Sequence, residues 1–134
     1  MCLDIITKRF NGKEQKKVVK GWKVVLEKID ANGNKELFSP IQNNLNERFT
    51  TKWIEDKSEA YIGDSYKTGF HIFRTRKGAR LWKKSYGKKP WKIVRVELTN
   101  IVCEGQQGGY IFSFIYGNKS IKVNVIVGRA IRIV

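Results

Sequence analysis

Proline, cysteine, histidine and long apolar runs are all scarce in this chain. Its 134 residues include two prolines, two cysteines and one histidine. Two cysteines are too few for a secreted disulfide framework, and with a single histidine they argue against a structural zinc site. The apolar runs are too short to span a bilayer, and the N-terminal stretch MCLDIITKRF has the features of neither a signal peptide nor an anchor. We therefore expect a cytoplasmic protein with free thiols.

Linkers and repeats are also missing, which favours one domain over residues 1–134. No Ser-, Pro- or Gly-rich stretch divides the chain, and 41% of the residues are hydrophobic. A chain of this length can bury one core but hardly two. The first twenty residues are rich in lysine, and we expect them to form a mobile basic arm.

Acidic residues are absent from residues 65–96, which contain eleven Lys or Arg. The whole chain has a net charge of +15, whereas residues 27–64 alone are net acidic, with five bases and eight acids. Charge of one sign gathered in one segment creates a local positive potential that attracts phosphates or acidic protein surfaces. This polarity is the strongest functional signal in the sequence.

Alternating apolar residues predict an α+β fold with a mostly antiparallel sheet of about six strands and one basic amphipathic helix. A hairpin is expected around Asn32-Gly33, because this dipeptide supplies the positive φ angles of tight turns. In KIVRVELTNIVCEG, alternation predicts that Val94, Val96, Leu98 and Val102 share one face. A second hairpin is expected to turn at Gly117-Asn118, and AIRIV to form a last short strand.

The helix is predicted between an N-cap at Thr75 and a C-cap at Gly87. Its apolar stripe contains Ala79, Trp82 and Tyr86, so Trp82 should face the sheet while the cations face outward. Trp91, beyond the helix, is expected to be more exposed than Trp82. The residues expected to bind nucleic acid or an acidic partner are Arg74, Arg76, Lys77, Arg80, Lys83, Lys84, Lys88, Lys89, Trp91 and Lys92. We call residues 74–92 the basic segment.

A run of cations is often only a solvated face, and crowding argues against that interpretation here. Arg76 and Arg80, and Arg80 and Lys84, are like-charge pairs four residues apart, each costing a few tenths of a kcal/mol. Acids would relieve the repulsion, and the segment has none. A phosphate backbone or an acidic protein surface would both satisfy this charge, and no motif for sequence-specific readout of nucleic acid is present.

An alternative is a nucleotide site formed by His71, Glu104 and Gln106. A carboxylate, the amides of Gln106 and Gln107, and a glycine-rich backbone in the polar stretch EGQQGG could hold a nucleotide or a ribose. A lone histidine on a strand is more often a packed residue, and EGQQGG has the composition of a turn, which is the interpretation we favour. No hydrolase triad, paired carboxylates or phosphate-binding loop is evident, so we predict no enzyme activity, cofactor or metal.

Several short motifs are similar to small proteins of bacteriophages and prophages. They are GWKVV, ELFSP, GFHIF before the helix, EGQQ, and the ending VNVIVGRAIRIV. The group has no assigned activity, so the resemblance implies no catalytic residue. It implies a stoichiometric binding protein in a bacterial host cell, of the kind that modulates host machinery or inhibits antiviral defence. The partner would be nucleic acid, a host nucleoprotein or, alternatively, a protein alone.

Overall fold

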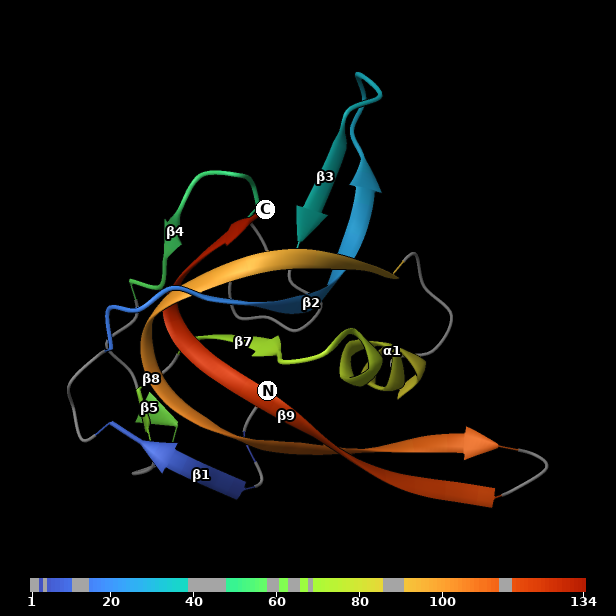
Figure 1. Cartoon of the computed structure of the whole chain (residues 1–134). Helices are drawn as coiled ribbons and strands as arrows, with labels where there is room; N and C mark the ends of the chain where they lie inside the picture. Colours follow the sequence, from blue (N-terminus) through green and yellow to red (C-terminus); the bar gives the residue numbers. More distant parts are fainter. Residues whose placement is uncertain are drawn as a thin grey trace.

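The computed structural model describes Leu3 and residues 5–10, 15–38, 48–57, 61–62, 66–67, 69–85, 91–113 and 117–134. Within these ranges the chain forms one helix and nine strands (Figure 1). The strands are β1 (Ile5–Arg9), β2 (Val19–Ile29), β3 (Lys35–Phe38), β4 (Ile54–Glu55), β5 (Tyr61–Ile62), β6 (Tyr66–Lys67), β7 (Phe70–Phe73), β8 (Trp91–Ser113) and β9 (Gly117–Ile133). The helix, α1, spans Arg76–Ser85.

Seven of the strands form one antiparallel sheet, which confirms the α+β class and corrects the expected number of about six. The order is β1-β8-β2-β7-β9-β4, with β3 paired to β2; β5 and β6 pair separately. Residues 1–20, expected to be a mobile arm, include β1 and Gln15, which both bond to β8. β1 has five residues and β4 only two, too few for a clear periodic pattern in the sequence.

Two long strands replace four shorter predicted ones. β8 has 23 residues and continues through EGQQGG, where Gly105 pairs with Val125 and Gln107 with Val123, so the predicted turn there is wrong. The predicted turn at Gly117-Asn118 is also misplaced, because both residues already pair with β8, and AIRIV simply continues β9. A glycine inside a strand weakens the strand but need not end it when the hydrogen bonds to the neighbouring strands still form.

The sheet closes on itself because β8 pairs with β2 along one edge and with β9 along the other. β2 and β7 complete the closure through the pair Trp22–Phe73. Close backbone approach is possible there because Gly21 has no side chain: an added Cβ would lie 2.6 Å from the Phe73 carbonyl oxygen. In Figure 1 the long curved ribbons of β8 and β9 run side by side over much of the closed sheet.

A bend in β8 moves its buried positions from even to odd residue numbers. Asn100 has φ 54°, and the register with β9 shifts between Ile101 and Cys103. Such bulges bend a strand and change the face on which later side chains lie. Val94, Val96 and Leu98 are buried as predicted, whereas after Asn100 the buried side chains are Ile101, Cys103 and Gln107. Val102 is only half-buried, so its predicted face was wrong.

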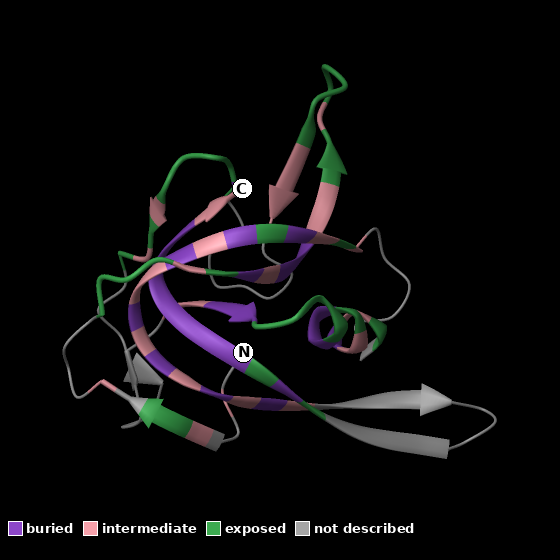
Figure 2. Ribbon diagram, viewed as in Figure 1, coloured by how far each residue is buried: buried purple, intermediate pink, exposed green. Residues whose placement is uncertain are grey.

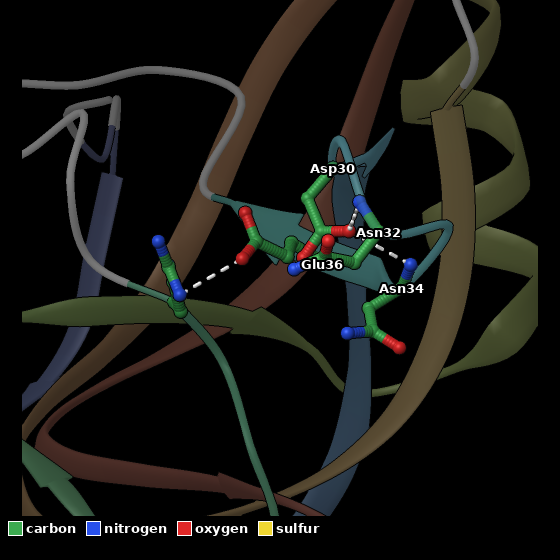
Figure 3. A network of polar contacts seen from close by, with 5 residues as sticks. Asp30, Asn32, Asn34 and Glu36 are labelled. Carbon is green, nitrogen blue, oxygen red and sulfur yellow. Dashed lines mark hydrogen bonds and ion pairs between the residues drawn. The ribbon is translucent and has the colours of Figure 1, made fainter.

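The first hairpin forms where the sequence predicts it, with Gly33 at φ 82°. The Asp30 carboxylate accepts hydrogen bonds of 2.9 Å from the backbone N–H groups of both Asn32 and Asn34 (Figure 3). The following strand is tied back by an ion pair of 2.8 Å between Glu36 and Arg48. These contacts stabilise a hairpin that rises away from the rest of the sheet in Figure 1.

Helix α1 begins at the predicted N-cap. Thr75 Oγ1 accepts a 3.0 Å hydrogen bond from the N–H of Gly78, three residues into the turn. The helix ends at Ser85 among the described residues; the predicted stripe residue Tyr86 and C-cap Gly87 lie outside them. This ten-residue helix is too short to cross a membrane, and the other described residues contain no spanning helix.

Two buried clusters lie on opposite faces of the sheet, and α1 packs on one of them. Trp82 faces inward as predicted, with its ring centroid 6.1 Å from that of Phe73. The helix-side core consists of Val24, Phe73, Ala79, Trp82, Cys103, Val123, Val125 and Val127. The opposite core consists of Val25, Phe49, Ile72, Val94, Val96, Leu98, Ile101, Ile126 and Ile131. In Figure 2 the buried positions run along β7 and β9, beside the helix.

Candidate anion-binding groove

A groove of about 530 Å³ separates α1 from the beginning of β8. Its volume falls within the range of roughly 300–1,000 Å³ that is usual for small-molecule sites. It is lined by Arg76, Arg80, Lys83, Lys84, Trp91, Lys92 and Ile93. Most of the basic segment that the structure describes thus meets in one concave site rather than on an open helix face.

The helix wall of the groove follows from the way α1 docks. Ala79 and Trp82 are buried in the helix-side core. Arg80, Lys83 and Lys84 each follow one of them by one or two positions, so each lies at least 100° around the helix from the buried residue that it follows. Arg80 and Lys84 are exposed, and Lys83 is half-buried. Burial of one apolar stripe therefore directs the cations along a single wall.

The strand wall is apolar. Trp91 pairs with Leu26 and Ile93 with Val24, and positions two apart in a strand share a face. Both side chains are half-buried and pack against the helix-side core, while also lining the groove. Trp91 was expected to be the more exposed tryptophan, and it is indeed less buried than Trp82. The groove thus has one cationic wall and one wall with an indole and an aliphatic side chain.

Positive charge in the groove is not compensated locally. Among the described residues, no carboxylate pairs with the four helix cations, and the first turn of α1 has no acid. Arg76 therefore adds to the partial positive charge of the helix N-terminus, which is unfavourable by a few tenths of a kcal/mol. Lys92 is the exception, since Glu27 lies 3.3 Å from its ammonium. A bound anion would relieve this repulsion.

Two residues beside the groove were not predicted from the sequence. The Trp22 ring lies under two guanidinium groups, with Arg76 at 5.5 Å and Arg95 at 5.7 Å from its centroid. This stacking orients Arg76, which also lines the groove. The signal available in the sequence was the alternation of Trp91, Ile93 and Arg95, which places Arg95 on the face of the groove.

Other predicted residues of the basic segment are placed differently. The Arg74 guanidinium lies 2.7 Å from the Glu104 carboxylate, and Arg74 is not among the groove residues. Lys77 is exposed on α1 but does not line the groove either. Lys88 and Lys89 lie outside the described residues.

The alternative nucleotide residues are divided between the two faces of the sheet. His71 pairs with Val127, which pairs with Cys103, so these three share the face of the helix-side core. Glu104 and Gln106 alternate with Cys103 and lie on the other face, where Gln106 donates a 3.3 Å hydrogen bond to the Asn124 side chain. His71 is 7% exposed, and burial together with the charge of Lys23 lowers its pKa to about 3. Its imidazole is therefore neutral at physiological pH.

Lys23 is a buried cation on the opposite core's side. Its ammonium donates a 2.8 Å hydrogen bond to the His71 carbonyl and lies 5.6 Å from the Phe49 ring centroid. Burial lowers its pKa from 10.5 to about 8. At 4% exposure it is buried, and its hydrogen bond links β2 to β7.

No group of three or more His, Cys, Asp or Glu side chains within the described ranges is arranged to hold a metal ion. Comparison with protein-family models, with curated proteins and with solved structures found no match to this chain.

Proposed function

We propose that this protein is a non-enzymatic nucleic-acid-binding protein whose groove between α1 and β8 holds the phosphate backbone. The observation that carries the proposal is the lining of the groove: five Lys or Arg residues and no carboxylate. Clustered cations gain affinity for polyanions by releasing condensed counterions, independently of sequence. The repulsion already present among the cations makes an anion the natural complement of this site.

A nucleic acid fits this groove better than an acidic protein surface for two reasons. The cations converge on a concave site, which suits a narrow chain of phosphates more than a broad protein surface. Trp91 and Ile93 also line it, and an indole ring stacks favourably with nucleobases. The proposal does not extend to sequence-specific readout, because contacts with phosphates carry no sequence information by themselves.

The biological setting that we propose follows the resemblance to phage and prophage proteins. In the cytoplasm of a bacterial host, such a binding protein would occupy nucleic acid or a host nucleoprotein, including a complex of antiviral defence. A purely protein-directed inhibitor is the alternative.

The salt dependence of binding tests the proposal. We expect the affinity for oligonucleotides to fall linearly with salt on logarithmic axes, with a slope near −3 if about four phosphates on a single strand are contacted at about −0.7 each. Reversal of Arg80, Lys83 and Lys84 to Glu should abolish binding. The matched control reverses the exposed Lys28, Lys52 and Lys57, which changes the net charge equally but lies elsewhere.

Two results would count against nucleic-acid binding. One is no binding by the wild type at low salt, and the other is equal loss in both triple variants, which would indicate net charge rather than the groove. A pull-down from nuclease-treated host lysate addresses the alternative. A protein that the wild type retains and that the variant with Arg80, Lys83 and Lys84 changed to Glu does not retain would indicate a protein-directed inhibitor.

A further inference from the structure

The two walls of the groove differ in chemistry, and this difference bears on the form of nucleic acid that it accepts. Four helix cations face a strand wall formed by Trp91 and Ile93. Guanidinium and ammonium groups contact phosphates, whereas an indole face contacts the flat face of a base. The groove can thus hold a phosphate against the helix cations and, beside it, an unstacked base against the strand wall.

Building on the proposed function, we infer that the groove selects single-stranded nucleic acid, with an unpaired base stacked on Trp91. In a duplex the base faces are covered by neighbouring bases, and proteins contact only base edges and the backbone. A duplex would therefore engage the cations at the rim and leave the Trp91 wall unused. In a single strand the bases can turn out and stack on an aromatic side chain.

The size and support of the site agree with this assignment. A volume of about 530 Å³ accommodates a nucleotide or two but not a double helix. Trp91 is held by pairing with Leu26 and by packing against the helix-side core, so its ring is oriented before a ligand arrives. Arg76 is similarly held over Trp22. Preorganised groups lose little conformational entropy on binding.

The experiment compares three ligands of equal length at one salt concentration: a single-stranded oligothymidylate, the same strand in a duplex, and a strand with abasic sites. Fluorescence anisotropy reports their affinities. We expect the wild type to bind the single strand at least tenfold more tightly than the duplex. The abasic strand keeps the phosphates but lacks bases, and it should bind at least about fivefold more weakly than oligothymidylate, in line with the energy of base stacking.

Substitution of Trp91 separates stacking from charge. Trp91→Ala should bind oligothymidylate at least about fivefold more weakly than the wild type does, with an unchanged salt slope. Its affinity for the abasic strand should equal that of the wild type. Trp91→Phe should retain most of the affinity. Trp53→Ala removes an exposed tryptophan outside the groove and serves as the matched control, with no expected change. The abasic comparison uses wild-type protein, so it remains informative even if Trp91→Ala destabilises the fold.

Outcomes for the inference differ from those for the proposed function. Equal affinity for single strand and duplex, or equal affinity for normal and abasic strands, would overturn the role of Trp91 while leaving backbone binding intact. Absence of binding to all three ligands at low salt would overturn the proposed function itself.

Discussion

The ammonium of Lys92, a residue that lines the groove, lies 3.3 Å from the carboxylate of Glu27. Lys92 lines the groove next to Trp91 in β8, and its ammonium is paired with this carboxylate from β2. Glu27 also lies 3.9 Å from Lys35. One acid thus neutralises a cation of the groove.

Substitution of Glu27 by Gln should therefore strengthen nucleic-acid binding. Loss of the carboxylate frees Lys92 and raises the positive potential at the rim, so we expect an affinity increase of about two- to fivefold at low salt. The salt slope should steepen by about 0.7 if Lys92 then contacts a further phosphate. Titrations by anisotropy measure both quantities. Glu36→Gln, which removes the partner of Arg48 instead, should leave them unchanged.

Replacement of Arg74 and of Arg80 by alanine should have very different effects on the affinity for nucleic acid. Arg74 is neutralised by Glu104 and does not line the groove, whereas Arg80 lines it and has no carboxylate partner among the described residues. We expect Arg80→Ala to lower affinity about fivefold or more at low salt, as lost phosphate contacts do, and Arg74→Ala to change it less than twofold. Equal losses in the two variants would contradict the placement of the site.

The buried Lys23 makes stability depend on pH in the alkaline range. Its pKa is about 8 in the folded protein and 10.5 when exposed, so the unfolded chain binds more protons between these values. The free energy of unfolding should therefore rise with pH across this window, by an amount on the order of 3 kcal/mol. Denaturant titrations of wild type and Lys23→Met at pH 7.5 and 10.5 isolate the effect. A pH-independent difference between the two proteins would disprove it.

Closure of the sheet should be sensitive to a single methyl group at Gly128. An added Cβ would lie 2.6 Å from Leu98 Cγ and 2.8 Å from the Thr99 carbonyl oxygen, where β9 pairs with β8. Gly128→Ala should destabilise the protein by about 1–3 kcal/mol or more, as overpacking does. Gly33→Asn, at a turn with open space around it, should cost less than about 1 kcal/mol because asparagine tolerates positive φ. Thermal melts compare the two variants.

Elements with local signals were predictable from the sequence. The turn at Gly33, the cap at Thr75 and the inward face of Trp82 each depend on residues within a few positions of one another, and each is confirmed. The bend at Asn100 was not predictable, because alternation alone assumes a regular strand. The predicted turns at EGQQGG and Gly117-Asn118 failed because glycines that usually mark turns are paired within β8 and β9. The short strands β1 and β4 were missed because they have too few residues for a periodic pattern.

The concentration of cations in residues 65–96 is a property of the sequence alone, and so is the amphipathic helix that carries many of them. Which cations act together was decided by contacts between distant residues. Pairing of β2 with β8 places Trp91 opposite the helix and brings Glu27 to Lys92. Pairing of both β7 and β8 with β9 brings Arg74, which follows β7, to Glu104. The charge of each side chain follows from its residue type. Whether that charge is neutralised depends on a partner distant in sequence, about thirty positions for Arg74 and Glu104 and more than sixty for Lys92 and Glu27. Only the folded sheet brings these partners within reach.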